Sequence, residues 1–144
     1  MDKKDIKFFV KRIFTKDLSL ESPEAPAIFD NIKATPKVAF NLNTTIATVD
    51  DTTYDITLDI NVKAETENNV IYLVEVKQSG LFVIDGADDE LKDVFLNIRC
   101  PEVIFPYARE TISSLVQKAG FPPIFIAPND FNALYQQELS KNKH

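Results

Sequence analysis

The sequence has few of the residues that catalytic, phosphate-binding and metal sites require. Its 144 residues include three glycines, one histidine and one cysteine. The glycines are too far apart to form either of the common phosphate-binding loops, and the histidine, His144, stands last in the sequence. A Ser–His or Cys–His catalytic pair, or a metal site of cysteine and histidine, has almost no residues to use. We therefore expect no enzyme activity, no cofactor and no metal.

Two clusters of acidic residues need a separate interpretation. Residues 50–51 and 88–90 are all Asp or Glu, but no histidine or second acidic set at ligand spacing accompanies them. Acidic side chains are also common in turns, and the helix dipole favours them in the first turn of a helix. We interpret the two clusters as a turn and a helix start.

The sequence also lacks a long apolar segment and a second cysteine. Near the N-terminus the apolar patch is Phe8, Phe9 and Val10, whereas a signal peptide needs about 7–15 apolar residues and a membrane-spanning helix about 18. Cys100 has no internal disulfide partner, which suits a reducing compartment. We expect a soluble protein of the cytoplasm with no direct membrane insertion.

Negative charge is in excess. Lys and Arg number 16 against 22 Asp and Glu, so the formal net charge is −6. Such a chain is repelled by nucleic acids and anionic lipids, so neither is an expected partner and a basic partner is favoured. The length and the 44% hydrophobic content predict one domain over residues 1–144, structured from about 8 to 139, with 1–5 and 140–144 as flexible tails.

Alternation of apolar and polar residues with period two marks four segments as strands. These segments are 7–20, 38–46, 54–63 and 70–84. In the first segment, the alternation places Phe8, Val10, Phe14, Leu18 and Leu20 on one face. Short turns at 50–51 and 67–69 join the last three strands, whereas prolines interrupt the longer connection over 23–36. The pattern predicts a four-stranded antiparallel sheet with one dry face.

After residue 88 the apolar period changes to 3.6 residues, which indicates helices. The predicted helices are 88–98, Pro101 to about Ala119, and about Asp130 to Leu139. Pro106 lies inside the second, where a proline costs about 3 kcal/mol, so either a kink or a helix start near Pro106 is expected. Strands followed by helices are typical of the α+β class, here a sheet with two main helices packed on one face.

Two regions carry more apolar residues than a minimal sheet needs. On the outer face of the fourth strand, Ile71 and Leu73 precede Glu75, and the first strand offers Asp17 and Glu21 to the same face. These side chains could be ordinary surface residues or a docking patch. The Phe-rich region over 121–135 could likewise be core or an apolar surface shared with another molecule.

Four blocks of the sequence resemble SecB, the bacterial protein-export chaperone family. They are RIFTKDLSLESPEAP at 12–26, EVKQSGLF at 75–82, CPEVIFPYARE at 100–110, and GFPP at 120–123 followed by Ala127-Pro128. Their order and spacing cover about residues 8–139. The resemblance implies a homotetramer, a dimer of dimers in which first strands pair at their edges and long helices pack between sheets. It also implies a chaperone that holds unfolded preproteins in the cytoplasm and delivers them to the motor ATPase SecA.

The resemblance also implies three sets of site residues. The SecA-docking surface would comprise Asp17, Glu21, Leu73 and Glu75. The client-binding groove would comprise Phe40, Leu42, Phe131, Leu134 and Tyr135, with Ile28, Phe29 and Ile32 as weaker candidates. The oligomer interface would comprise Ile104, Ala108, Ile112, Leu115 and Val116, the apolar stripe of the long helix.

Two departures from the family pattern and two alternative functions remain. The long connection has Ala34-Thr35-Pro36 where relatives often have a Trp, and the sequence ends Lys141-Asn142-Lys143-His144 in place of an acidic tail. Within the family, the alternative is a SecB-like chaperone of a toxin–antitoxin system. From another class, it is a small-molecule or lipid-binding α+β domain that uses the Phe-rich region as a pocket.

Overall fold

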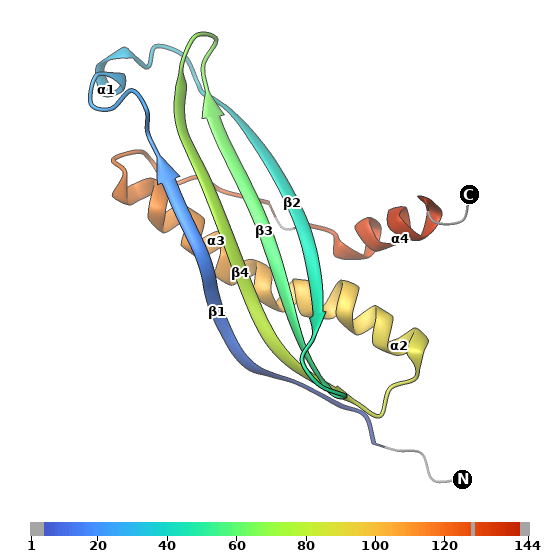
Figure 1. Cartoon of the computed structure of the whole chain (residues 1–144). Helices are drawn as coiled ribbons and strands as arrows, with labels where there is room; N and C mark the ends of the chain where they lie inside the picture. Colours follow the sequence, from blue (N-terminus) through green and yellow to red (C-terminus); the bar gives the residue numbers. More distant parts are fainter. Residues whose placement is uncertain (1–4, 128, 142–144) are drawn as a thin grey trace.

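The computed structural model describes residues 5–127 and 129–141 and contains a four-stranded antiparallel sheet, as the alternation predicts. The strands are β1 (Lys7–Glu21), β2 (Lys37–Thr48), β3 (Thr53–Glu65) and β4 (Val70–Asp85), in the spatial order β1-β4-β3-β2. β1 and β2 are therefore the two edges (Figure 1). Of the expected tails, residues 1–4 and 142–144 lie outside the described part.

The connections follow the turn chemistry of the sequence. Between β2 and β3, one carboxylate oxygen of Asp50 accepts hydrogen bonds from the backbone N–H groups of Thr52 and Thr53, at 3.0 and 2.9 Å. The bond from Thr52 contributes most to holding the pKa of Asp50 below its usual value. The acidic pair at 50–51 is thus part of a turn. The long connection from β1 to β2 contains one short helix, α1 (Ile28–Asn31).

A continuous helical segment follows the sheet. It consists of α2 (Asp89–Val94), a π-helical turn η1 (Phe95–Arg99) and α3 (Cys100–Lys118). The carboxylate of Asp88 caps α2 by accepting the N–H of Leu91 at 2.8 Å, as expected for a helix start. The wide turn precedes Pro101, whose ring would crowd the preceding turn of a regular α-helix. Because α3 begins at Cys100 and runs through Pro106, the alternative of a start near Pro106 is wrong.

The last helix, α4 (Phe131–Lys141), is close to its prediction. An oxygen of the Asp130 carboxylate accepts the N–H of Ala133 at 3.0 Å, which is the expected N-cap geometry. The helix continues two residues beyond the predicted end at Leu139. Residues 140 and 141, which the sequence analysis assigns to a tail, are therefore part of the helix.

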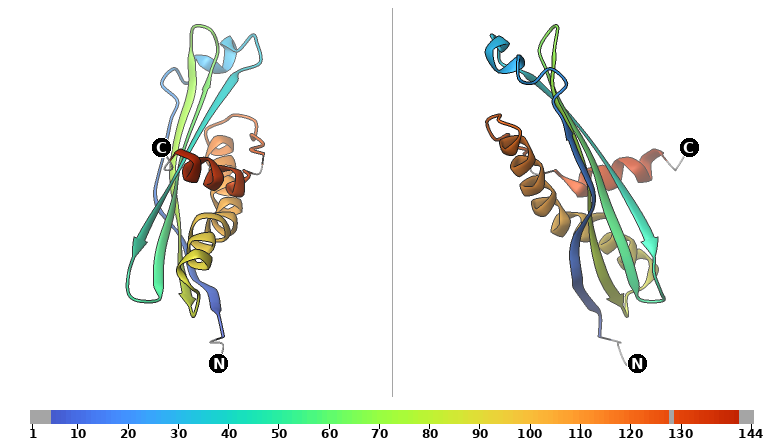
Figure 2. Two further views of the ribbon diagram at one scale, coloured as in Figure 1. Left: turned by 90° about the vertical axis from the view of Figure 1, so that its right-hand side faces the viewer. Right: turned by 60° about the vertical axis from the view of Figure 1, so that its left-hand side comes forward.

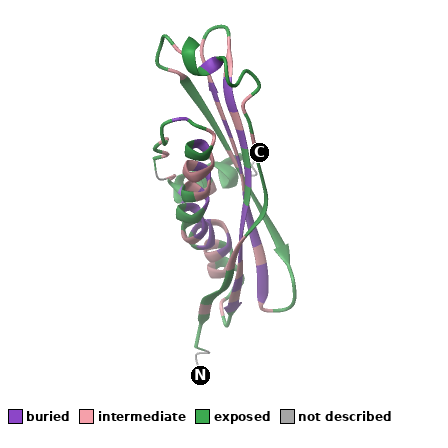
Figure 3. Ribbon diagram, turned by 90° about the vertical axis from the view of Figure 1, so that its left-hand side faces the viewer, coloured by how far each residue is buried: buried purple, intermediate pink, exposed green. Residues whose placement is uncertain are grey.

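The helices α2, α3 and α4 lie on one side of the sheet, and we name that side the helical face and the other the outer face (Figure 2). The core forms between the helical face and α3, and Figure 3 shows the buried positions gathered there. From α3 it contains Ile104, Ala108, Ile112 and Val116, all 0% exposed. The prediction that these four form an oligomer interface is wrong, because they pack against the sheet of their own chain. Leu115, the fifth residue of that prediction, is half-buried.

The predicted alternation of β1 is interrupted twice. The pairing with β4 skips one residue between Val10 and Arg12 and again between Thr15 and Asp17. After the first skip Ile13 and Thr15 pair with helical-face positions of β4, while Phe14 pairs with outer-face Ser79. The prediction of Phe14 on the apolar face is therefore wrong, because each extra residue reverses the faces that follow.

No helix in the described ranges is both long enough and apolar enough to span a membrane.

Candidate functional site

The outer face of the sheet places residues of all four strands in transverse rows, because paired residues of adjacent strands point to the same side. Read from β1 to β2, the first row is Glu21, Leu73, Lys63 and Ala39. The second row is Ser19, Glu75, Asn61 and Asn41, and the third is Asp17, Lys77, Asp59 and Asn43. All four residues of the predicted docking set therefore lie on one face, within three adjacent rows.

The first two rows line a hollow of about 410 Å³, which we name the outer hollow. All eight of their residues contribute to its wall, including Glu21, Leu73 and Glu75 of the docking set. Asp17 belongs to the next row. Glu21, Glu75 and Asp17 are exposed, whereas Leu73 is half-buried. The surface thus combines three carboxylates available to solvent with one apolar side chain in the floor.

The sequence did not indicate how far the outer hollow extends towards β2. Asn61 and Lys63 of β3 and Asn41 of β2 join it, and Lys77 lies between Asp17 and Asp59 in the third row. Nζ of Lys63 lies 3.5 Å from a carboxylate oxygen of Glu65 on the same strand. These contributions depend on strand order and register, which a single strand's alternation does not contain. The outer face is therefore mixed in charge and not uniformly acidic.

A second surface follows β2 along the helical face. One hollow of about 440 Å³ lies between β2 and α4, and Leu42, Phe131, Leu134 and Tyr135 line it. These are four of the five predicted groove residues. The fifth, Phe40, lines a neighbouring hollow of about 430 Å³ together with Val38. The predicted groove residues therefore divide between two adjacent hollows that share β2 as a wall.

The groove residues differ in how far they are exposed, and this shows which of them form the floor of the groove and which form its rim. Phe131 is buried and its ring packs edge-on against that of Phe105, with centroids 5.9 Å apart, so it forms floor. Leu134 is 40% exposed and stands at the rim. The most exposed large apolar side chain of this region is Phe125, at 83%, on the connection between α3 and α4. The sequence placed Phe125 in a Phe-rich region without assigning it to the groove.

The three weaker groove candidates lie in or directly after α1, and none of them lines either hollow beside β2. Ile28 is buried in the core, at 2% exposure. Phe29 is exposed, and its ring packs against that of Phe121 with centroids 5.2 Å apart. Ile32 is half-buried against the core. Ile28 is thus a core residue, and its burial anchors the connection between β1 and β2.

The single thiol is unsuited to chemistry. Cys100 is fully buried at the start of α3, and burial raises the pKa of its thiol to about 12. The nucleophilic thiolate is therefore scarce at neutral pH. Within residues 5–127 and 129–141, no cluster of three or more His, Cys, Asp or Glu is placed to hold a metal ion.

The four-stranded antiparallel sheet with helices on one side of it is the fold of a SecB-like chaperone. A SecB-like chaperone of Mycobacterium tuberculosis, solved in complex with a ChAD peptide from the HigA1 antitoxin, superposes with a TM-score of 0.67. The superposition covers 83% of this chain and 88% of that one, at 12% sequence identity. The likeness at that identity is one of fold.

Sequence comparison identifies the family. The family model described as "Preprotein translocase subunit SecB" matches residues 1–142. The "Protein-export protein SecB" of Methylococcus capsulatus is 39% identical over 92% of this chain and 84% of its own length. That of Marinomonas sp. is 43% identical over 93% of this chain and 84% of its own length. The chain belongs to the SecB family.

Proposed function

We propose that this chain is a non-enzymatic holdase of protein export. It binds unfolded preproteins in the cytoplasm, keeps them competent for translocation and delivers them to SecA. The observation that carries the proposal is the similarity to proteins named protein-export protein SecB, at 39% identity or more over more than nine-tenths of the chain. The surfaces on the two sides of the sheet support it, because they separate client binding from motor binding.

The groove along β2 is suited to clients of many sequences. Its walls combine apolar side chains such as Leu42, Phe40 and Leu134 with the open polar position Thr44. Burial of apolar area contributes about 25 cal/mol per Å² without demanding a particular sequence. Several shallow contacts along one unfolded chain then add up through effective concentration. This is the form of binding that a holdase needs.

The outer face is suited to a basic partner. Glu21, Glu75 and Asp17 present carboxylates to solvent, and Leu73 adds an apolar contact between them. Opposite charges steer association and fix orientation more than they add affinity. We assign this face to the basic tail of SecA. Binding there leaves the groove on the helical face free for a client.

The homotetramer that we propose uses edge strand β1. Large apolar side chains on or beside this strand remain exposed, namely Ile6, Phe9, Val10 and Leu18. An edge strand that carries such residues is a template for pairing with another chain. Pairing of β1 with β1 of a second copy would cover them. Tyr107, which is 52% exposed on α3, would then belong to the helix contacts between dimers.

Two measurements on the purified protein test the proposal. It should suppress the aggregation of a chemically unfolded preprotein in light scattering, and it should bind the cognate SecA in titration calorimetry. Suppression without SecA binding would favour the toxin–antitoxin chaperone. Retention of an apolar ligand through purification, with no suppression, would favour the small-molecule or lipid-binding domain. Either result overturns the assignment to protein export.

A further inference from the structure

The second bulge of β1 decides which side chains reach the outer face. Lys16 is the residue that the pairing skips between Thr15 and Asp17. Before it, Phe14 points outward; after it, Asp17 pairs with Lys77 and points outward as well. Side chains alternate strictly along a strand, so one extra residue reverses every position that follows.

The second bulge therefore decides to which face the acidic residues of β1 in the docking set point. If β1 continued from Phe14 without the extra residue, Leu18 and Leu20 would point outward. Asp17, Ser19 and Glu21 would then point to the helical face. The bulge is therefore the device that brings the acids of β1 beside Leu73 and Glu75 of β4.

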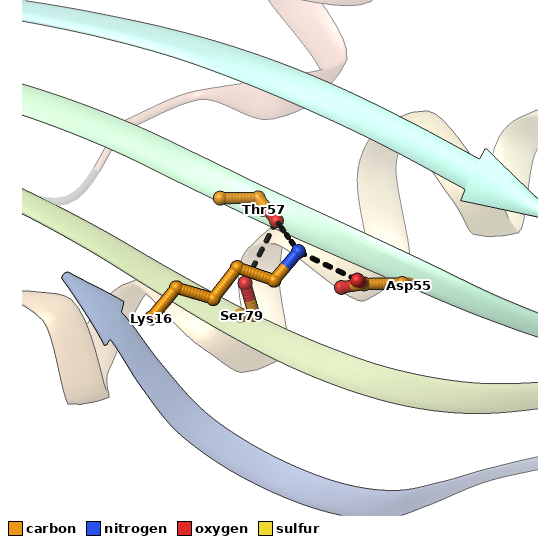
Figure 4. Close-up of polar contacts among 4 residues, drawn as sticks. All are labelled: Lys16, Asp55, Thr57 and Ser79. Carbon is orange, nitrogen blue, oxygen red and sulfur yellow. Dashed lines mark hydrogen bonds and ion pairs between the residues drawn. The ribbon is translucent and has the colours of Figure 1, made fainter.

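Lys16 does not project freely into solvent. Its ammonium lies 2.6 Å from a carboxylate oxygen of Asp55 and donates a hydrogen bond of 3.2 Å to the hydroxyl of Thr57 (Figure 4). Both partners belong to β3, so the side chain crosses β4 and joins the edge strand to the third strand of the sheet. It crosses at Ser79, which is 0% exposed and whose small side chain leaves room. The hydroxyls of Thr57 and Ser79 are 2.7 Å apart and hydrogen-bonded.

The partners of Lys16 are poorly solvated. Thr57 and Ser79 are buried, and the second carboxylate oxygen of Asp55 is buried without a hydrogen-bond partner among the described residues. A carboxylate that has lost part of its hydration depends on its counter-ion more than an exposed carboxylate does. Removal of the ammonium therefore leaves Asp55 uncompensated, and the bulge loses its attachment to the sheet.

We propose that Lys16 and Asp55 form a clamp that fixes the bulge of β1 and so positions Asp17 and Glu21 for the docking partner. The inference rests on the proposed function, since it assigns the outer face to SecA. In this proposal Lys16 is a positioning residue, because it acts through the strand and does not touch the partner.

The direction in which the affinity for SecA changes when Lys16 is removed distinguishes a positioning role from a direct electrostatic effect of its charge. Lys16 is a cation close to an acidic surface and repels a basic partner. Coulomb interactions alone therefore predict that its removal strengthens the binding of that partner. The clamp predicts that its removal weakens binding. Lys77 is the matched control, because it is exposed in the same row as Asp17 but takes no part in the clamp.

The test compares SecA affinity by titration calorimetry for the wild type, Lys16→Met, Lys16→Arg and Lys77→Gln. We expect Lys16→Met to bind at least five-fold more weakly and Lys16→Arg to stay within two-fold of the wild type, because it keeps the ion pair with Asp55. Lys77→Gln should bind as tightly as the wild type or more tightly. Lys16→Met binding as tightly as the wild type, or more tightly, overturns the clamp.

A second measurement does not need SecA. Amide hydrogen exchange should accelerate in the segment 17–21 of Lys16→Met, whereas exchange in β2 should stay as in the wild type. If Lys16→Met does not fold, the isosteric Asp55→Asn variant takes its place with the same expectation. Unchanged exchange in 17–21 overturns the clamp. A wild type that binds no SecA but shows the accelerated exchange on mutation overturns the proposed function and leaves the clamp supported.

Discussion

At the scale of single residues, the proposed docking of a basic partner depends on the negative charge of Glu75. It lies in the second row of the outer face, between Ser19 of β1 and Asn61 of β3, and its side chain is exposed in the outer hollow. Its removal therefore creates no cavity and leaves no buried group without a partner. An effect of substitution there would report on the partner and not on the stability of the chain.

Reversal of this charge, Glu75→Lys, is expected to weaken SecA binding about ten-fold, because it places a cation where a basic partner docks. Client holding should stay unchanged, because the groove lies on the other face. Titration calorimetry with SecA and light scattering with an unfolded preprotein measure the two properties. Glu90→Lys, an exposed position on α2, is the matched control. Normal SecA affinity in Glu75→Lys would remove this residue from the docking set.

The buried thiol allows a second prediction at this scale. In the native protein Cys100 should react with a disulfide reagent at pH 8 far more slowly than a free thiol, because its pKa of about 12 and its burial both suppress the thiolate. In denaturant one equivalent should react at once. A rapid reaction under native conditions would show that the start of α3 opens locally.

At the scale of elements, the groove requires α4 to be in place. This helix supplies Leu134 and Tyr135 to the hollow beside β2, and Phe131 anchors its first turn against Phe105. The remaining turns are largely exposed, so little burial holds them. Capping at the first turn therefore contributes a large share of the stability of α4.

Asp130→Ala removes the capping oxygen from the first turn of α4 and should cost about 0.5–2 kcal/mol in helix stability. Because α4 forms one wall of the groove, affinity for an unfolded client should fall several-fold, while SecA binding on the outer face is retained. Fluorescence titration with a labelled client measures the change. Ser140→Ala, an exposed position near the end of the same helix, should leave client affinity unchanged. Equal client affinity in Asp130→Ala and the wild type would show that α4 is not a wall of the groove.

At the scale of the whole molecule, the two edge strands both expose apolar side chains but differ in that the groove lies beside β2. β1 carries Phe9, Val10 and Leu18 in exposed positions. β2 lies against the hollows of the groove, with Phe40 and Leu42 in their walls. If β2 paired with another chain, the groove would be narrowed or covered. Self-association through β1 leaves both proposed binding surfaces open.

Leu18→Lys should therefore reduce the mass of the particle in solution, because it places a charge on the edge that pairs. Ile46→Lys, on the other edge at 37% exposure, is the control and should leave the mass unchanged. Multi-angle light scattering at micromolar concentration reports both. If the wild type has a monomeric mass at that concentration, the homotetramer is wrong. If only Ile46→Lys lowers the mass, the pairing edge is β2.

The sequence by itself determined the four strands, the short turns, the capped helices and the outward position of Leu73 and Glu75, because periodicity and turn chemistry are properties of neighbouring residues. The resemblance to SecB supplied the function and the groove residues. Only the tertiary structure showed which surface covers the apolar stripe of α3. Ile104 and Ile112 are buried against their own sheet, since an apolar stripe shows that a face is covered but not by what.

The bulges of β1 also belong to the tertiary structure. A bulge is a relation between two strands, so in the sequence Lys16 only interrupts the apolar face of the first strand, and the alternation predicts the wrong face for Phe14. The contacts of Lys16 with Asp55 and Thr57 join residues about 40 positions apart. The lining of the outer hollow likewise depends on the tertiary structure, because the order β1-β4-β3-β2 and the pairing register bring Glu21 and Lys63 into one row. The physical reason is that register and strand order depend on long-range pairing, which local alternation does not encode.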